Sequence, residues 1–211
     1  KQCSESAEDV VSHIESGDKV FVHGAAATPT PLLEALSRRT DVEGVEVYHL
    51  HLSGPIPFAA PEDGGKVFSN SLFTGPALRV PIAEGRADFI PVFLSDVPGL
   101  FTNRIIDLDV ALVQLSPPDR HGHCSLGPSV DTALAAARSA RKVLAEINHR
   151  MPRTLGHSVV PFASVNHFTV TDRPLLEHPP TPETAVAARP GARNGDQVED
   201  GTPLQMGTDG I

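Results

Sequence analysis

Two continuous apolar runs separated by an alanine-rich stretch place the tightest constraint on how this chain folds. The runs cover residues 110–115 and 143–147, and continuous apolar runs are typical of strands that are buried on both faces. Residues 129–141 between them are rich in alanine and open with a cap, which predicts a crossover helix. Because parallel strands need such a crossover, we expect a right-handed βαβ unit in an α/β fold with a mostly parallel sheet and flanking helices.

Helix and strand signals also precede this unit. Ser6 and Asp9 match a capping box, which predicts a helix over residues 7–16. Thr30-Pro31 reads as an N-cap with proline at the first helical position. Alternating or β-branched runs predict further strands over 19–23, 45–52 and 89–94.

The composition changes from about residue 171, where prolines and glycines become frequent. Such a stretch leaves little room for regular structure and predicts a Pro/Gly-rich extension. We therefore expect one domain over residues 1–175, a linker over 176–199, and the truncated start of a second domain over 200–211.

Composition excludes some classes of partner. The formal net charge is −9. The chain lacks the clustered Lys and Arg residues that bind phosphate backbones, so a nucleic-acid partner is not expected. No apolar run is long enough to cross a bilayer, so no membrane association is expected. Two cysteines cannot make a disulfide framework, which favours an intracellular location, in the cytoplasm or the mitochondrial matrix.

Five segments carry a family resemblance, and they occur in the family's own order. They are residues 17–36, 69–79, 84–101, 116–131 and 148–158. Together they resemble the acetyl-CoA hydrolase/transferase family, which includes 4-hydroxybutyrate, acetate and succinate CoA-transferases. The resemblance covers nearly the whole chain and identifies it with the amino-terminal domain of that family.

The resemblance implies a two-domain enzyme in which each half has the NagB/RpiA/CoA-transferase type of fold and the active site lies between the halves. Family members use an active-site glutamate that attacks an acyl-CoA and becomes a glutamyl-CoA thioester. That glutamate lies in the carboxy-terminal half, beyond Ile211, so no catalytic residue is expected in this chain. CoA or acyl-CoA and short carboxylic acids are then substrates, with no permanently bound cofactor, and the missing domain is the main partner.

Two loops are candidates for the substrate pocket. Gly24, Ala25 and Thr28 precede the start of a helix, where free N–H groups can hold a carboxylate or phosphate. A simple packing turn is the alternative there. Asn70 and Ser71 are expected in a polar loop, where Ser71 either donates to an acyl carboxylate or helps to form a turn.

Further pocket candidates follow the two apolar runs. Asn148, Met151 and Pro152 come directly after a strand and form either a pocket wall or a rigid turn. Gly127 ends a turn that the resemblance places at the interdomain cleft. Gln205 and Gly207 match the family's glycine loop, although Thr208-Asp209 depart from it.

We interpret the remaining histidines and Cys124 as loop, surface or strand residues. His121, His123 and Cys124 have metal-binding residue types, but they share one loop without a second pair of ligands, so no metal is predicted. The remaining early histidines, His13, His23, His49 and His51, are interpreted as surface or strand residues without a named partner.

The sequence leaves three functions open. The first is a CoA-transferase half that is inactive alone, and the second is a hydrolase of the same family. The third is a short non-catalytic protein that binds a partner through the face that a second domain would cover. An exposed apolar face of that kind also favours a homodimer.

Overall fold

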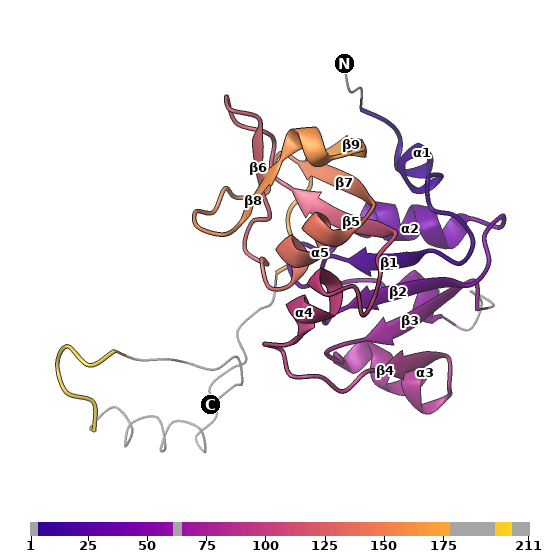
Figure 1. Ribbon diagram of the computed structural model, residues 1–211, viewed down its shortest axis with the longest axis horizontal. Helices are drawn as coiled ribbons and strands as arrows, with labels where there is room; N and C mark the ends of the chain where they lie inside the picture. The colour runs from indigo at the N-terminus through magenta and orange to yellow at the C-terminus, as the bar shows by residue number, and fades with distance from the viewer. Residues whose placement is uncertain (1–3, 61–64, 178–196, 204–211) are drawn as a thin grey trace. The chain divides into compact units, whose positions relative to one another are not determined.

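A seven-stranded parallel sheet organises the computed structural model, which describes residues 4–60, 65–177 and 197–203. The strand order is β4-β3-β2-β1-β5-β7-β9, and Figure 1 shows the sheet running through the centre of the fold. The strands are β1 Lys19–Val22, β2 Val45–His49, β3 Val67–Ser71, β4 Ala87–Phe89, β5 Val110–Leu115, β7 Lys142–Asn148 and β9 His167–Thr171. A short antiparallel pair, β6 His123–Ser125 and β8 Val159–Pro161, stands apart from the sheet.

Helices cover both faces of this sheet (Figure 1). The α-helices are α1 Ala7–Val11, α2 Thr30–Arg38, α3 Arg79–Ala83, α4 Val97–Thr102 and α5 Ala133–Ser139. Short 3-10 turns occupy Pro57–Ala59, Pro76–Leu78 and Phe162–Ser164. Helices α1 and α2 pack in one apolar layer, and α4 and α5 pack in the other.

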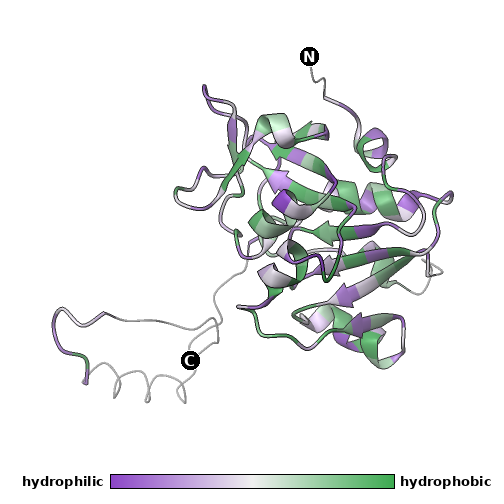
Figure 2. Cartoon of the chain, in the orientation of Figure 1, coloured by the Kyte–Doolittle hydropathy of each residue, from purple (hydrophilic) through white to green (hydrophobic). Residues whose placement is uncertain are grey.

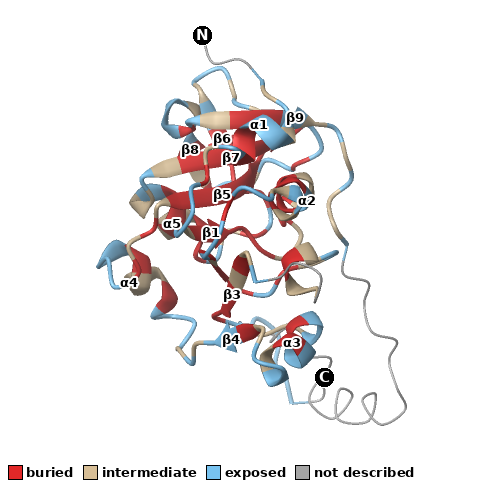
Figure 3. Cartoon of the chain, turned by 90° about the vertical axis from the view of Figure 1, so that its right-hand side faces the viewer, coloured by how far each residue is buried: buried red, intermediate tan, exposed pale blue. Residues whose placement is uncertain are grey.

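The alternation of side chains along β1 and β5 explains why their sequences are apolar throughout. Val20 and Val22 of β1 belong to the layer under α1 and α2, whereas Phe21 belongs to the layer under α4 and α5. Strand β5 divides its residues in the same way, because successive side chains of a strand point to opposite faces. Figure 2 shows these central strands as hydrophobic, and Figure 3 shows them as buried.

The chain reverses its direction across the sheet between β1 and β5. From β1 to β4, each successive strand lies one position nearer to one edge of the sheet. Strand β5 then returns to the other side of β1, with Val20 opposite Val110, and β7 and β9 continue to the opposite edge. The loops that follow β1 and β5 therefore leave the sheet in different directions, and open α/β sheets bind ligands at such a point.

The α/β fold and its central elements confirm the sequence predictions. Strand β5 has the predicted bounds, β1 and β7 agree within one residue, and β5 and β7 are parallel neighbours joined through α5. The predicted capping box is also present at Ser6 and Asp9. Helix α5 is shorter than predicted because the Asp131 carboxylate accepts hydrogen bonds from the N–H groups of Thr132 and Ala133, which start the helix there.

Several predicted bounds are wrong. The first helix ends at Val11 instead of residue 16, since the N–H of Ser12 already bonds in a tightened turn to the carbonyl of Asp9. The second helix begins at Thr30, which places Pro31 at its second position. Strand β2 ends at His49, so the predicted extension to residue 52 is not formed.

Two errors concern the far half of the sheet. The strand predicted over 89–94 is wrong, because β4 ends at Phe89 and Pro91 has no N–H to continue the ladder. The polar loop predicted around Asn70 and Ser71 is strand β3, where these residues lie opposite Tyr48 and His49. Its sequence carries polar residues at buried positions, so it lacks an apolar pattern.

The chain divides into two units at Leu176 and Glu177. The described part of the second unit beyond residue 177 is a turn in which the N–H of Thr202 bonds to the carbonyl of Glu199. Most of the predicted linker and second-domain start lies outside the described residues, so those boundaries stay predictions. Among the described helices, none has the length and hydropathy that a bilayer crossing requires.

Candidate functional site

The loop after β1 lies tightly against the end of β2. A methyl group on Gly24 would stand 2.7 Å from the carbonyl oxygen of His51, which leaves no room for a side chain. Ala25 follows with a positive φ of 50°, and its N–H donates to the same His51 carbonyl at 3.1 Å. The small residues of this loop are therefore required by the close approach of two backbones.

Thr28 ties this loop to its neighbours through both its side chain and its backbone. Its hydroxyl donates to the carbonyl of Ala25 at 2.8 Å and accepts from the N–H of Ser53 at 3.1 Å. Its carbonyl accepts from Gln114 Nε2 at 3.2 Å and from Arg173 Nη2 at 2.9 Å. The loop after β1 is thus held by residues from β5 and from the segment after β9.

Gln114 and Asn148 continue the polar network beneath that loop, and neither side chain is exposed. Asn148 Nδ2 donates to Gln114 Oε1 and to the carbonyl of Arg173, both at 2.9 Å. Its Oδ1 accepts from the N–H groups of Arg150 and Arg173. The amide of Asn148 is therefore fully used, and its role is to position the segments around it.

A buried ion pair completes the network. The carboxylate of Glu146 on β7 has no exposed surface and receives Arg173 Nε at 2.6 Å. Arg173 Nη2 reaches the second oxygen at 2.9 Å, and the hydroxyl of Thr171 donates to the first at 2.7 Å. Bidentate geometry with an added hydroxyl donor is what makes a buried carboxylate tolerable.

Two fully buried histidines support the strand ends, and both are neutral. His23 Nδ1 accepts from the N–H of Gln114 at 3.3 Å, so its Nε2 donates to the carbonyl of Ser129 at 2.5 Å; burial lowers the pKa of His23. His49 donates through Nδ1 to the carbonyl of Leu50 and accepts from the Ser69 hydroxyl through Nε2 at 2.8 Å. Burial lowers the pKa of His49 to about 4.

The turn after β6 is packed against the segment after β7. Gly127 has a positive φ of 69°, and a methyl group there would stand 2.1 Å from Met151 Sδ. The N–H of Gly127 donates to Ser125 Oγ at 3.1 Å, and the N–H of Met151 donates to the carbonyl of Asn148 at 3.0 Å. Pro152 is exposed directly beside this contact.

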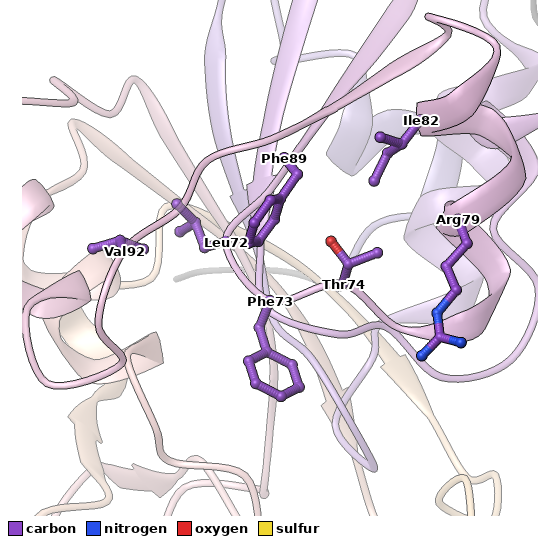
Figure 4. A pocket seen from close by; sticks show the side chains of 7 residues that line it. All are labelled: Leu72, Phe73, Thr74, Arg79, Ile82, Phe89 and Val92. Carbon is purple, nitrogen blue, oxygen red and sulfur yellow. The ribbon is translucent and has the colours of Figure 1, made fainter.

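A hollow of about 560 Å³ opens at the carboxyl ends of β3 and β4. Figure 4 shows its walls, with the guanidinium of Arg79 as the charged group among them. Its lining consists of Leu72, Phe73, Thr74, Arg79, Ile82, Phe89 and Val92. Ser71 lies beneath it, fully buried, with its hydroxyl accepting from Thr74 Oγ1 at 3.3 Å.

Exposed apolar side chains surround this hollow, and we call them the β3–β4 patch. A second hollow of about 540 Å³ adjoins the first along Phe89, Pro91, Val92, Phe93 and Asp96. The exposed members of the patch are Phe73, Val80, Phe89, Phe93 and Leu94, of which Phe93 is 80% exposed. Exposed apolar side chains gathered in one part of a fold can mark an interaction site.

The structure connects most of the residues that the sequence singled out. Gly24, Ala25 and Thr28 share one loop, and Gln114 links Thr28 to Asn148. Asn148 is joined in turn to Met151, which contacts Gly127. Asn70 and Ser71 lie across β2 from the loop after β1, and Gln205 and Gly207 lie outside the described residues.

Sequence reasoning missed Gln114, Glu146 and Arg173. The first two stand alone as polar residues inside continuous apolar runs, and a polar group at such a position must have a buried partner. That signal was available. Arg173 carried no such signal, because its partner Glu146 lies 27 residues earlier in the sequence.

Of the three residues with metal-binding side chains, His121 lies in the turn before β6, and His123 and Cys124 lie in the strand itself. Burial raises the pKa of the Cys124 thiol to about 11, which keeps it protonated. Asp119 accepts from the N–H groups of His121 and His123 and pairs with Arg153 at 2.6 Å. In the part of the chain that the structure describes, these side chains are not among those that converge for a metal ion.

Comparison with known protein families shows which family has this architecture. The model of the acetyl-CoA hydrolase/transferase N-terminal domain matches residues 2–177. This chain is a member of that family. The resemblance predicted from the five sequence segments is confirmed, and the parallel sheet described above is the fold of the acetyl-CoA hydrolase/transferase N-terminal domain.

Two curated relatives cover nearly the whole chain. A succinyl-CoA:acetate/propanoyl-CoA:succinate CoA transferase of Fasciola hepatica is 38% identical over 98% of this chain and 44% of its own length. A 4-hydroxybutyrate coenzyme A transferase of Clostridium kluyveri is 36% identical over 98% of this chain and 48% of its own length. The chain therefore spans about half the length of the curated relatives it matches.

Solved structures agree with this placement. RipA from Yersinia pestis superposes with a TM-score of 0.90 at 28% identity, covering 97% of this chain and 50% of that protein. A 4-hydroxybutyrate CoA-transferase from Porphyromonas gingivalis superposes with a TM-score of 0.80 at 31% identity, covering 98% and 48%. The predicted CoA-transferase type of fold is thus confirmed for the described residues.

Proposed function

We propose that this chain is the amino-terminal half of an enzyme that transfers CoA between short carboxylic acids, such as acetate or 4-hydroxybutyrate. The observation that carries the proposal is the match to two named CoA-transferases, which extends over 98% of this chain but under half of each relative. The family description also includes hydrolases. Transferase is favoured because both of these relatives are named for transfer to a carboxylic acid.

The reaction needs a nucleophile that we place outside this chain. A glutamate carboxylate attacks the acyl-CoA thioester, which forms an acyl–glutamyl anhydride and releases the CoA thiolate. The thiolate then attacks the glutamyl carbonyl, releasing the first acid and leaving a glutamyl-CoA thioester. The incoming acid reverses these two steps, so CoA is transferred and the glutamate is restored. Hydrolysis results if water attacks instead.

In this proposal the described half supplies one wall of the active site. The loop at Gly24, Ala25 and Thr28 stands at the reversal point between β1 and β5, where α/β sheets bind ligands. The exposed Pro152 extends the wall along the same end of the sheet, and the buried Asn148, Met151 and Gly127 support it from behind. The buried Asn70 and Ser71 support the wall beneath the hollow at the ends of β3 and β4. Close backbone packing and saturated hydrogen bonds support a rigid, preformed surface.

We also propose the partners and the location. A carboxy-terminal domain covers the face that carries the β3–β4 patch, because those side chains are apolar and exposed. We propose a homodimer of the whole enzyme and a reducing compartment, either the cytoplasm or the mitochondrial matrix. The reduced, buried Cys124 is consistent with that location.

The test measures CoA transfer from acetyl-CoA to labelled carboxylic acids. The complete encoded protein is expected to show ping-pong kinetics and to accumulate a glutamyl-CoA thioester that borohydride reduces. The purified 211-residue chain is expected to show no exchange of labelled acetate into acetyl-CoA. Turnover by the short chain alone would contradict the assignment of the glutamate, and release of free CoA without transfer would favour the hydrolase.

A further inference from the structure

Glu5, His13 and His167 converge at the end of the sheet opposite to the candidate acyl-CoA site. Each offers one ligand atom, and these atoms all lie within 4.8 Å of one another. His167 is the first residue of β9, whereas the candidate site lies where the strands end. We infer that these three side chains form a binding site for a divalent transition-metal ion, with Zn²⁺ as the best match, a function beyond the proposed CoA transfer.

The three ligands come from three separate segments of the chain. Glu5 precedes α1, His13 follows α1, and His167 begins the edge strand β9. The N–H of Glu5 donates to the carbonyl of Phe168 at 2.9 Å, which fixes the first segment along the edge strand. This backbone hydrogen bond therefore places Glu5 beside His167 independently of any attraction between their side chains.

The imidazole rings of His13 and His167 both lie close to the carboxylate of Glu5. His167 Nδ1 lies 2.9 Å from Glu5 Oε1, and His13 Nε2 lies 3.8 Å from Glu5 Oε2. The two rings stack with their centroids 3.5 Å apart and their planes inclined by 21°. Ligand atoms in a tetrahedral zinc site are separated by about 3.4 Å, as follows from metal–ligand bonds of about 2.1 Å. Small side-chain rotations would therefore complete the coordination.

The partial exposure of the three side chains permits those rotations and the entry of a metal ion. The neighbouring positive charge does not oppose the ion. The side chains of Glu5, His13 and His167 are each about one third exposed, so they are neither locked nor fully solvated. The nearby ammonium of Lys142 contacts the backbone carbonyl of His13 and pairs with Glu15 at 3.2 Å. Its positive charge is thus already balanced by a carboxylate outside the site.

The donor set selects the class of metal. Two imidazole nitrogens and one carboxylate oxygen suit Zn²⁺ and related transition-metal ions, whereas Mg²⁺ and Ca²⁺ prefer oxygen ligands throughout. Three protein ligands leave a fourth position for water. A bound ion would tie the segment before α1 to the edge strand, two parts of the chain that are 162 residues apart.

Calorimetric titration of Zn²⁺ into the metal-free 211-residue chain tests this inference. We expect one ion per chain, and replacing either imidazole, in His13→Gln or His167→Gln, to weaken binding by at least about tenfold. Glu5→Gln should also weaken it. His149→Gln and His157→Gln remove exposed histidines elsewhere and should leave the affinity unchanged.

Cobalt provides a second measurement that does not depend on stability. Co²⁺ bound to this site should give the strong visible absorption of tetrahedral coordination, and Mg²⁺ should give neither heat nor competition. Circular dichroism in chelator establishes that each variant is folded before titration. The inference is overturned if the chain binds no Zn²⁺, or if His13→Gln and His167→Gln bind it as tightly as the control variants do.

Discussion

At the scale of single residues, Gly127 shows how little space separates the turn after β6 from Met151. Gly127→Ala adds a methyl group at a positive φ and 2.1 Å from Met151 Sδ, so we expect a loss of about 2–3 kcal/mol in the free energy of unfolding. Gly122→Ala is the matched control, because Gly122 has a φ of 76° but nothing within 4 Å. Urea denaturation of both variants separates the packing cost from the backbone cost. Equal losses would argue against the close contact.

The buried histidines predict how stability depends on pH. The pKa of His49 falls from its ordinary 6.5 to about 4 on folding, and that of His23 is also lowered by burial. The unfolded chain therefore binds more protons below pH 6.5, so the free energy of unfolding decreases as pH falls from 6.5 towards 4. His49 contributes a slope of up to about 1.4 kcal/mol per pH unit within this window. The lowered pKa of His23 acts in the same direction.

Urea denaturation at several pH values measures that slope. His49→Gln should make it shallower, because the glutamine cannot titrate. His157→Gln, which replaces an exposed histidine, should leave the slope as it is. An unchanged slope in His49→Gln would show that His49 does not titrate on unfolding in this range.

Residue identity alone predicted part of the candidate site. The loop at Gly24 was recognisable because small residues stand directly before the start of a predicted helix. Its close approach to the His51 carbonyl fits the packing turn that was given as the alternative. The role of Asn148 was not, since its amide is saturated by Gln114 and by the backbone around Arg173. Those partners come together only when β5, β7 and the segment after β9 are side by side.

At the scale of elements, one ion pair joins β7 to the segment after β9. Arg173→Met leaves the Glu146 carboxylate buried without its cation, and we expect a loss of about 3–5 kcal/mol in stability. Glu146→Gln should cost less, because the Arg173 side chain is 21% exposed and can reach water. The measurement is chemical denaturation of both single variants and the double variant. Strict additivity of the two losses would contradict direct coupling.

Elements were predictable where their burial was uniform. Strands β5 and β7 are buried on both faces and read as apolar runs. Strand β3 was missed because Ser69, Asn70 and Ser71 occupy its buried positions, where Ser69 bonds to His49 of the neighbouring strand. A polar strand of this kind is defined by its partners, which no periodicity in its own sequence reveals.

At the scale of the whole molecule, the β3–β4 patch predicts self-association of the 211-residue chain. Phe93 is 80% exposed and Phe89 is 46% exposed, and covering them removes apolar surface from water. Sedimentation velocity should show a concentration-dependent shift to larger species, which Phe93→Asp reduces. Leu155→Asp is the control, because Leu155 is 91% exposed but follows β7 in the other half of the sheet. Equal effects of the two substitutions would show that self-association does not depend on the β3–β4 patch in particular.

The family resemblance predicted the architecture of the whole domain better than periodicity did. Five short segments in order identified the family that the comparison confirms over residues 2–177. Periodicity recovered the central strands but missed β3, which is polar, and β6, β8 and β9, which are short or lie at an edge. Short strands carry too few residues for an alternating pattern to be recognised.

The return of β5 to the side of β1 has a consequence for synthesis on the ribosome. Val20 pairs with Val110, so β1 lacks this neighbour until some 90 further residues have been made. A sheet of β1 to β4 alone would leave the apolar edge of β1 unpaired, and unpaired strand edges can pair with other chains. Pairing with β5 covers this edge of β1, and β7 and β9 then extend the sheet on the same side.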